Sequence, residues 1–292
     1  MTIDEVKRIA VVGAGAMGSQ IAMVCALGGF ETSVCDAVPE AVKKAEGWAA
    51  KWLEERVAKG RLTAAQTAAA QRRLTFASSL AAAAGSADFV IEAIIEEEDA
   101  KRACFAELDK TCPPHAILAT NSSSILSSRI ADATKRPDKV LNMHFFNPVV
   151  VMELVEVMGH PGASEESIGI TMELSRRIGK TPVRVRKEIP AFIANRILHA
   201  VANEAMRLVE KGVATPEEVD LAVEKGLRYP MGPFRLMDLT GLDVGYQVRM
   251  ARYRQSGDPA DKPHALLVEK YEKGEFGRKT GKGWYEYPEP KK

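Results

Sequence analysis

A glycine-rich stretch near the amino terminus constrains the fold of this chain more than any other feature. The apolar run Arg8–Val12 has the composition of a buried strand, and Gly13-Ala14-Gly15-Ala16-Met17-Gly18 follows it at once, before a helical stretch over residues 19–28. In a dinucleotide-binding fold the first glycine allows the tight turn, the second lets a pyrophosphate approach the backbone, and the third lets the helix pack closely on the strand. The pattern therefore predicts a pyrophosphate site at Gly13–Gly18. The alternative is a glycine turn in an α/β fold that binds no nucleotide.

The residue that ends the second strand bears on the choice of nucleotide. The strand-like run Glu31–Cys35 is followed by Asp36, about 20 residues beyond the glycine turn, where an acidic side chain meets the ribose diol in dinucleotide-binding folds. An aspartate there would repel a 2′-phosphate, and residues 37–40 supply no arginine to bind one. We therefore expect NAD rather than NADP.

Strand-like and helical runs alternate over the first two thirds of the chain. Two helical patterns, over residues 40–59 and 64–73, precede the third strand-like run, so we predict an inserted helical hairpin. Strand signals stop after Arg186, and Thr215-Pro-Glu-Glu218 has the pattern of a helix amino terminus. We predict a Rossmann-type doubly wound α/β domain over residues 1–188, followed by an all-helical domain over residues 189–292. The later strand-like runs are Leu74–Phe76, Asp88–Glu92, Ala116–Thr120, two strands within 140–158, and Thr181–Arg186.

Composition excludes several classes of function. The 40 basic and 39 acidic residues are interspersed, so no nucleic-acid footprint is evident. The four cysteines form no CxxC pair, which indicates neither a zinc site nor a disulfide framework, and we expect no metal. No apolar run is long enough to span a bilayer, and no cleavable apolar region precedes the first strand. We expect a cytoplasmic protein without a membrane partner.

The predicted hairpin is rich in basic residues. They could meet a polyanion such as the phosphates of coenzyme A, or they could simply be solvated, as most basic residues on surface helices are. Neighbouring glutamates weaken their field. The basic residues are Lys43, Lys44, Lys51, Arg56, Lys59, Arg61, Arg72 and Arg73.

Polar residues follow the carboxyl ends of the later strands. Glu96 and Lys101 come after the fourth predicted strand, and Ser122-Ser123-Ser124 comes after the fifth. In a doubly wound sheet the loops beyond these strand ends line the ligand crevice. A serine run that opens a helix is also a common N-cap, so from the residues alone the serines are either caps or contacts to a substrate oxygen.

Two short apolar strands hinged at Asn147-Pro148 carry the candidate base. They put His144 at the end of the first strand and Glu156 inside the second. A neutral imidazole can take a hydroxyl proton at neutral pH, and a carboxylate on its other nitrogen fixes the tautomer and stabilises the resulting cation. The pair is a candidate general base with its orienting acid. Alternatively, His144 merely caps a strand and Glu156 lies on a solvated face.

Taken together, these motifs resemble the L-3-hydroxyacyl-CoA dehydrogenase family, and in particular its short 3-hydroxybutyryl-CoA members. The resemblance implies that His144 is the base and Glu156 its partner, with Ser123 and Asn195 as polar contacts to the reacting oxygen and the thioester. It also implies a homodimer through the helical domain and NAD contacts from Asp36, Glu96, Lys101, Ser123, Asn147 and Lys279. The motifs are Gly13/Gly15/Gly18, Asn121-Ser-Ser-Ser, His144-Phe-Phe-Asn-Pro148, Leu154-Val-Glu156, Phe192-Ile-Ala-Asn195-Arg196, Tyr229-Pro-Met-Gly-Pro-Phe234 and Lys279-Thr-Gly-Lys-Gly-Trp.

The expected activity is interconversion of a (3S)-3-hydroxyacyl-CoA and its 3-ketoacyl-CoA. Two alternatives stay open: the same chemistry on a free 3-hydroxy acid or related small alcohol, and a non-catalytic NAD-binding protein. From the residues alone, Asn195 either faces the crevice or lies on the surface. The chain also departs from the usual family pattern, with Val150 in place of a proline, Glu153 where lysine is frequent, and Ala191 in place of a glycine.

Overall fold

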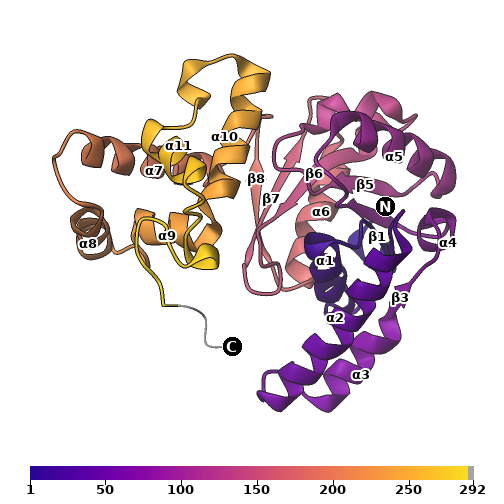
Figure 1. The fold of residues 1–292 in the computed structure, drawn as a ribbon. Coiled ribbons are helices and arrows are strands. Elements are labelled where there is room, and N and C mark those ends of the chain that lie inside the picture. Colours follow the sequence, from indigo (N-terminus) through magenta and orange to yellow (C-terminus); the bar gives the residue numbers. More distant parts are fainter. Residues whose placement is uncertain (289–292) are drawn as a thin grey trace. The chain divides into compact units, whose positions relative to one another are not determined.

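The computed structural model describes residues 1–288 and consists of two compact units. The first unit spans Met1–Phe192 and the second Ile193–Lys292 (Figure 1). The division falls four residues after the one that we expected from the sequence. None of the described helices combines the length and apolar character needed to cross a membrane.

An eight-stranded sheet forms the centre of the first unit, in the order β3-β2-β1-β4-β5-β6-β7-β8. Every neighbouring pair is parallel except β6 and β7, which run antiparallel. The predicted Rossmann-type doubly wound class is confirmed, since the order 3-2-1-4-5-6 is that of this fold. The strands are β1 Arg8–Val12, β2 Glu31–Cys35, β3 Leu74–Phe76, β4 Phe89–Glu92, β5 Ile117–Thr120, β6 Val140–Phe145, β7 Leu154–Gly159 and β8 Thr181–Val185.

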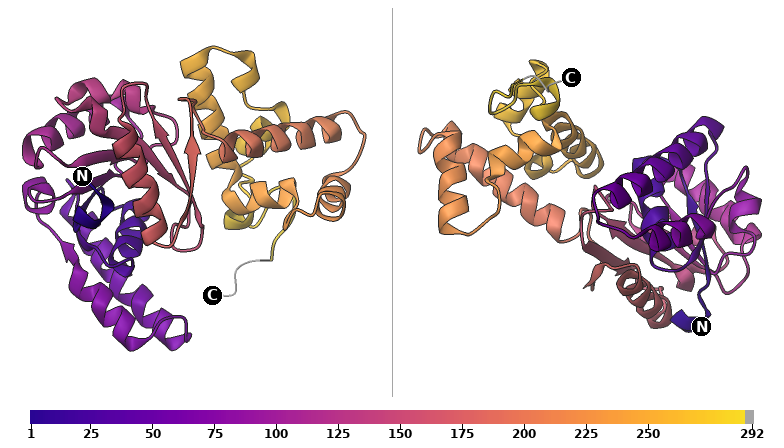
Figure 2. Two further views of the ribbon diagram at one scale, coloured as in Figure 1. Left: turned by 180° about the vertical axis from the view of Figure 1, so that it is seen from behind. Right: turned by 90° about the horizontal axis from the view of Figure 1, so that it is seen from below.

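Helices cover both faces of this sheet (Figure 2). Consecutive residues of β1 show the two faces: Val11 belongs to the core under α1 (Ala16–Leu27) and α6 (Glu165–Arg177), and Val12 to the core under α4 (Leu80–Ala84) and α5 (Glu98–Thr111). Because both faces are buried, β4 and β5 contain only buried residues. This explains why the strands read as continuous apolar runs rather than as alternating ones.

The predicted helical hairpin is present as α2 (Pro39–Ala58) and α3 (Ala64–Arg73), and it projects from the rest of the first unit (Figure 1). A capping box at Thr63 and Gln66 begins α3. The hairpin packs on α1 through a separate apolar cluster that includes Met23, Leu53 and Ala70. Its outer surface carries the basic residues.

The second unit is helical, with a core around Met206, Phe234 and Leu267. The expected start at Thr215 is found, because its side chain accepts a hydrogen bond from the Glu218 amide and Pro216 occupies the first turn. The long helices are α7 Ala194–Glu210, α8 Pro216–Gly226, α9 Pro233–Thr240, α10 Leu242–Ser256 and α11 Ala265–Glu272.

Two buried aspartates hold the second unit's glycine-containing motifs in place. Asp220 accepts hydrogen bonds from the Phe234 amide at 2.8 Å and from the Tyr285 hydroxyl at 2.7 Å. Asp238 accepts one from the Trp284 amide at 2.9 Å. A Cβ at Gly232 would lie 2.3 Å from the Asp220 carboxyl carbon, so that position requires glycine. These hydrogen bonds hold both motifs in the fold of the second unit.

Two segments differ from the expectation. The strand that we expected directly after Pro148 begins only at Leu154, because residues 149–151 form a turn. The domain that we expected to be all-helical from residue 189 has its first helix only from Ala194, because Ala191 and Phe192 have φ values of 65° and 54°. Left-handed backbone cannot continue a right-handed helix.

Candidate active site

The glycine turn at the end of β1 has the close contacts that the sequence led us to expect. Gly13 has a φ of 104°, and a Cβ there would lie 2.5 Å from the Ala93 carbonyl oxygen. A Cβ on Gly18 would lie 1.8 Å from the Gly13 carbonyl oxygen. A Cβ on Gly15, in contrast, would meet nothing within 4 Å. The first and third glycines are needed for packing, and the second leaves room for a phosphate beside the start of α1.

Asp36 lies beside this turn, at the end of β2. One carboxylate oxygen accepts a hydrogen bond from the Ala14 amide at 2.7 Å, and the other accepts one from the Val38 amide at 2.9 Å. These bonds fix the carboxylate at the edge of the phosphate turn, where a ribose diol can reach it. The observed geometry fits an NAD site.

Glu96 accepts several hydrogen bonds from the serine loop that follows β5. Its Oε1 accepts hydrogen bonds from the Ser122 hydroxyl at 2.6 Å, the Ser124 hydroxyl at 2.8 Å and the Ser123 amide at 3.1 Å. The Ser122 hydroxyl also accepts from the Ile125 amide at 2.8 Å and so holds the loop, but it caps no helix, because the next described helix, Ser127–Arg129, has Leu126 as its N-cap. Among the described residues no hydrogen bond uses the Ser123 hydroxyl, which leaves it for a ligand.

Burial by itself would raise the pKa of Glu96, but the ammonium of Lys101 and the hydrogen bonds from Ser122 and Ser124 act in the opposite direction and prevail. The pKa of this carboxyl is therefore lower than usual, and Glu96 is ionised at neutral pH. Its charge is available to orient the loop donors.

Lys101 faces inward. Its side chain is 1% exposed, and Nζ lies 2.6 Å from Oε1 of the fully buried Glu92 and 3.5 Å from Oε2 of Glu96. The other Glu92 oxygen accepts a hydrogen bond from the Thr120 hydroxyl at 2.6 Å. The structure thus brings Glu96 and Lys101 together, as expected for two residues on adjoining loops, but it adds Glu92 and Thr120, which sequence reasoning missed. The sequence does contain a signal for Glu92, because a glutamate ends the otherwise apolar run Phe89-Val-Ile-Glu92.

His144 and Glu156 lie directly opposite each other in the antiparallel pair β6–β7. Their side chains point to the same face, and His144 Nδ1 lies 3.1 Å from Glu156 Oε2. Glu156 is 1% exposed, so the alternative that it lies on a solvated face is wrong. Phe146 packs edge-on against the imidazole, with ring centres 4.6 Å apart, and Phe192 packs nearly parallel to it at 4.7 Å. Among the described residues none hydrogen-bonds to His144 Nε2.

Family models match nearly the whole chain. The NAD-binding domain of 3-hydroxyacyl-CoA dehydrogenase matches residues 8–189, and the C-terminal domain of the same enzyme matches residues 192–287. The chain belongs to the 3-hydroxyacyl-CoA dehydrogenase family. It is therefore an NAD-dependent oxidoreductase, which confirms the cofactor that the glycine turn and Asp36 favoured.

Individual relatives agree with this assignment. The chain is 41% identical over 285 residues to a probable 3-hydroxybutyryl-CoA dehydrogenase of Bacillus subtilis, which covers 98% of this chain and 99% of the relative. It is 38% identical to the mitochondrial hydroxyacyl-coenzyme A dehydrogenase of Homo sapiens, over 97% and 91% of the two chains. The crystal structure of (S)-3-hydroxybutyryl-CoA dehydrogenase from Ralstonia eutropha superposes with a TM-score of 0.90 at 36% identity and covers 98% of this chain and 100% of that one.

This dehydrogenase holds the turn after β6 with a partly buried lysine. Lys180 Nζ donates to the carbonyl oxygens of Val149 and Met152, the latter at 2.8 Å. Burial lowers the pKa of Lys180, and nearby Glu153 opposes that shift. The side chain of Asn147, an expected NAD contact at the start of this turn, is exposed. Sequence reasoning missed Lys180, because nothing near Gly179-Lys180 indicates which carbonyls it reaches.

The two other predicted site residues belong to the second unit. Asn195 is the second residue of α7 and is half-buried. Lys279 forms an ion pair with Asp243, and its side chain remains 49% exposed. Within the described part of the chain, no three His, Cys, Asp or Glu side chains are grouped so that they could hold a metal ion.

Replacing Lys101 with methionine tests the buried pair. Lys101→Met leaves the Glu92 carboxylate buried without its cation, which should lower the free energy of unfolding by about 3–5 kcal/mol in urea titrations. Adding Glu92→Gln removes the stranded charge and should recover a large part of that loss. A double variant no more stable than Lys101→Met would show that the two charges are not coupled.

Proposed function

We propose that this dehydrogenase interconverts (3S)-3-hydroxybutyryl-CoA and its 3-ketoacyl-CoA, with His144 as the general base. The observation that carries the proposal is the buried contact between His144 and Glu156 at the carboxyl edge of the sheet, in the unit that carries the NAD turn. The names of the Bacillus subtilis and Ralstonia eutropha relatives support the substrate.

Glu156 sets the tautomer of the base. A carboxylate only accepts hydrogen bonds, so we assign the ring proton to Nδ1 of His144, and Nε2 keeps its lone pair. Nε2 takes the proton of the 3-hydroxyl, and the imidazolium that forms lies 3.1 Å from the Glu156 carboxylate. Bound NAD would supply the acceptor for the hydride that leaves C3. In the reverse direction the imidazolium returns its proton to the oxygen of the 3-keto group.

Ser123 and Asn195 are the proposed polar contacts to the substrate. The Ser123 hydroxyl is not engaged by any described residue, and the Ser123 amide is fixed by Glu96 at 3.1 Å. A donor held in this way stabilises developing charge without reorganising. The residues that remain proposed NAD contacts are Asp36, Glu96, Asn147 and Lys279. For Lys101 we propose an indirect effect on NAD, through the charge that it places beside Glu96.

The hairpin is the proposed site for the coenzyme A phosphates. Lys43 and Lys59 are engaged by Glu40 and Glu55, and Arg56 stacks over Trp52 with its guanidinium carbon 5.1 Å from the ring centre. The remaining basic residues make no ion pair with a described residue and are the better candidates for a phosphate. They are Lys44, Lys51, Arg61, Arg72 and Arg73.

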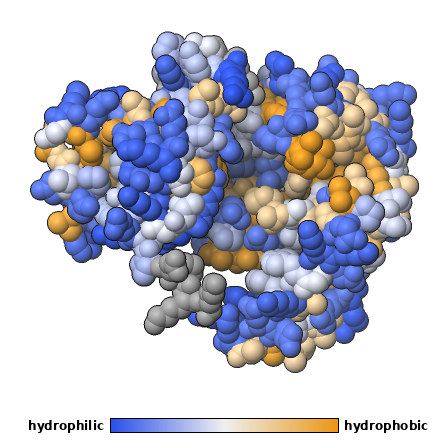
Figure 3. All heavy atoms as spheres, in the orientation of Figure 1, coloured by the Kyte–Doolittle hydropathy of each residue, from blue (hydrophilic) through white to orange (hydrophobic). Residues whose placement is uncertain are grey.

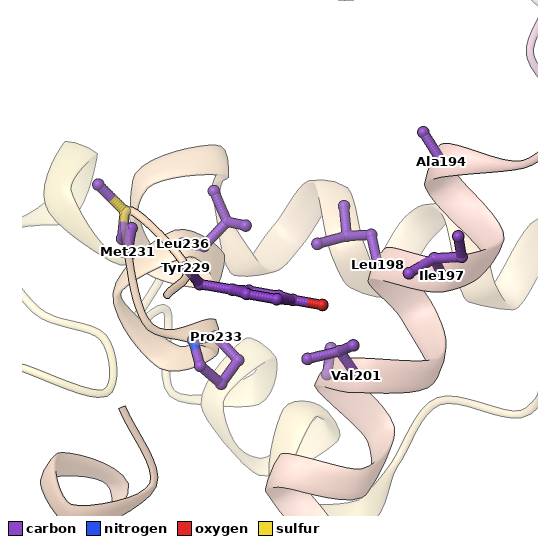
Figure 4. A pocket seen from close by; sticks show the side chains of 9 residues that line it. Ala194, Ile197, Leu198, Val201, Tyr229, Met231, Pro233 and Leu236 are labelled. Carbon is purple, nitrogen blue, oxygen red and sulfur yellow. The ribbon is translucent and has the colours of Figure 1, made fainter. Parts of the chain in front are cut away.

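Exposed apolar residues support a homodimer through the second unit. Nine of the fifteen large apolar side chains that are exposed among the described residues lie there, although it is the smaller unit. A cavity of about 310 Å³ opens between α7 and the segment before α9, and the Tyr229 ring extends toward Ile197, Leu198 and Val201 (Figure 4). Figure 3 shows apolar patches between hydrophilic ones on the surface. Clustered exposed apolar surface is typical of an interface between subunits.

A cytoplasmic location also remains a prediction.

One alternative has support of its own. The structure of a diketoreductase, described as acting on dicarbonyl compounds, has a TM-score of 0.86 and 31% identity to this chain. That relative is described with dicarbonyl compounds, so the same chemistry on a free 3-hydroxy acid or related small alcohol remains the second candidate here. A non-catalytic NAD-binding role is disfavoured by the intact His144–Glu156 pair.

The choice of substrate is tested by comparing acetoacetyl-CoA with free acetoacetate, each with NADH and with NADPH. We expect kcat/KM to be at least about 100-fold higher for the thioester. Contacts to its coenzyme A part, which the free acid lacks, contribute several kcal/mol to transition-state binding. We also expect kcat/KM to be higher with NADH than with NADPH, because Asp36 repels a 2′-phosphate. Faster turnover of the free acid would contradict the thioester proposal, and a preference for NADPH would contradict the role of Asp36.

The base is tested by His144→Gln. Glutamine keeps a polar side chain of similar size but cannot accept the proton, so kcat should fall by about 10²–10⁴-fold while NADH binding, measured by fluorescence titration, changes little. His160→Gln, at a histidine that bonds the Pro137 carbonyl on the surface, is the matched control and should keep full activity. Unchanged turnover in His144→Gln would place the base elsewhere.

The dimer is tested by placing a charge in the exposed apolar surface. Ile197→Glu, at a residue 56% exposed on α7, should convert the dimer to monomer in sedimentation velocity, because burying an unpaired carboxylate at an interface is unfavourable. Val183→Glu, at an exposed apolar residue of edge strand β8, is the control and should leave the dimer intact. A wild-type chain that sediments as a monomer would end the dimer proposal.

A further inference from the structure

The segment that ends the first unit places an aromatic ring against the imidazole of His144. The rings of Phe192 and His144 have centres 4.7 Å apart and planes inclined by 22°. Phe146 packs edge-on against the same imidazole at an interplanar angle of 63°. The contact of Nδ1 with Glu156 therefore restrains rotation of the imidazole within its plane, and the two phenylalanine rings restrain its tilt out of that plane.

The Phe192 ring is itself tightly held. It is 1% exposed and lies in a small apolar cluster with Met158 and Val185. Met158 follows Glu156 by two residues in β7, so their side chains share one face of the sheet. Phe192 thus packs on the same sheet face that carries His144 and Glu156.

The backbone in this segment adopts a conformation that L-residues avoid. Ala191 and Phe192 have φ values of 65° and 54°, in the left-handed region that is unfavourable for residues with a Cβ. Two hydrogen bonds hold the conformation: the Ala191 amide donates to the Ser123 carbonyl at 3.1 Å, and the Phe192 amide donates to the Ile189 carbonyl at 3.3 Å. The first ties the segment to the serine loop beside the site. Strain of this kind persists only where the surroundings fix it, and it gathers at functional sites.

We propose that Phe192 is a positioning residue, which acts through His144 by holding the imidazole plane at the angle that directs Nε2 toward the substrate hydroxyl. The left-handed pair Ala191–Phe192, bonded to the Ser123 carbonyl, sets where the Phe192 ring lies. This inference rests on the proposed role of His144 as the base. It assigns a second function to a segment whose first is to join the two units.

Phe192→Leu tests the proposal, because leucine keeps a buried apolar side chain but has no flat face. We expect kcat to fall about 10-fold, while KM for acetoacetyl-CoA and for NADH stay within about 2-fold, because the ground-state contacts remain and only the alignment of the base changes. Phe89→Leu is the matched control: Phe89 is also fully buried but begins β4, at the opposite end of the sheet from the site. That variant should lose stability and keep kcat.

A spectroscopic measurement separates this proposal from that of the base. The chain has five histidines, so the imidazole carbon-bound protons of His144 are identified by their loss in His144→Gln. Phe192→Leu should move these signals, because a stacked ring no longer lies over them. A moved signal with unchanged kcat, or equal losses of kcat in Phe192→Leu and Phe89→Leu, would overturn the positioning role. An active His144→Gln enzyme would instead refute the base, even if the moved signal still showed the ring contact.

Discussion

The antiparallel pairing of β6 with β7 is the interaction on which the rest of the site depends. It is the one antiparallel pair in the sheet of the described chain, and it places His144 and Glu156 directly opposite each other on one face. A shift of one residue in this register would turn one of the two side chains to the other face. Burial then strengthens the contact, because a hydrogen bond to a carboxylate is worth more where water is excluded.

Around this pair, several residues of the proposed site are each held in position by a second residue that contacts them. Glu156 lies behind His144, Glu96 collects the amides and hydroxyls of the serine loop, and Lys101 balances Glu96 while it pairs with Glu92. The arrangement is costly to bury, since each charge loses its hydration. It is stable because Lys101 lies beside Glu92 and Glu96, and because the serine loop donates several hydrogen bonds to Glu96. Such preorganisation favours chemistry in which charge moves and the surroundings do not.

The sequence predicted the parts of the site that depend on local pattern. The glycine turn, Asp36 and the helical hairpin were found where the residues indicated, because a turn after a strand and the periodicity of a helix are properties of neighbouring residues. It missed Glu92, Thr120, Lys180 and Phe192, although all four are in the printed sequence. Each acts on a residue between 9 and 48 positions away, and nothing in the local pattern names that partner.

By itself, the sequence determined the fold class, the order of the two domains and the preference for NAD, because hydrophobic periodicity, glycine spacing and an acid at a strand end express these locally. Only the tertiary structure decided that Lys101 turns inward to Glu92, that the Ser122 hydroxyl holds the serine loop, and that Phe192 stacks on His144. The physical reason is that alternation along a strand tells which face a side chain takes. Which of several facing groups comes within 3 Å depends on register and on the packing of distant segments.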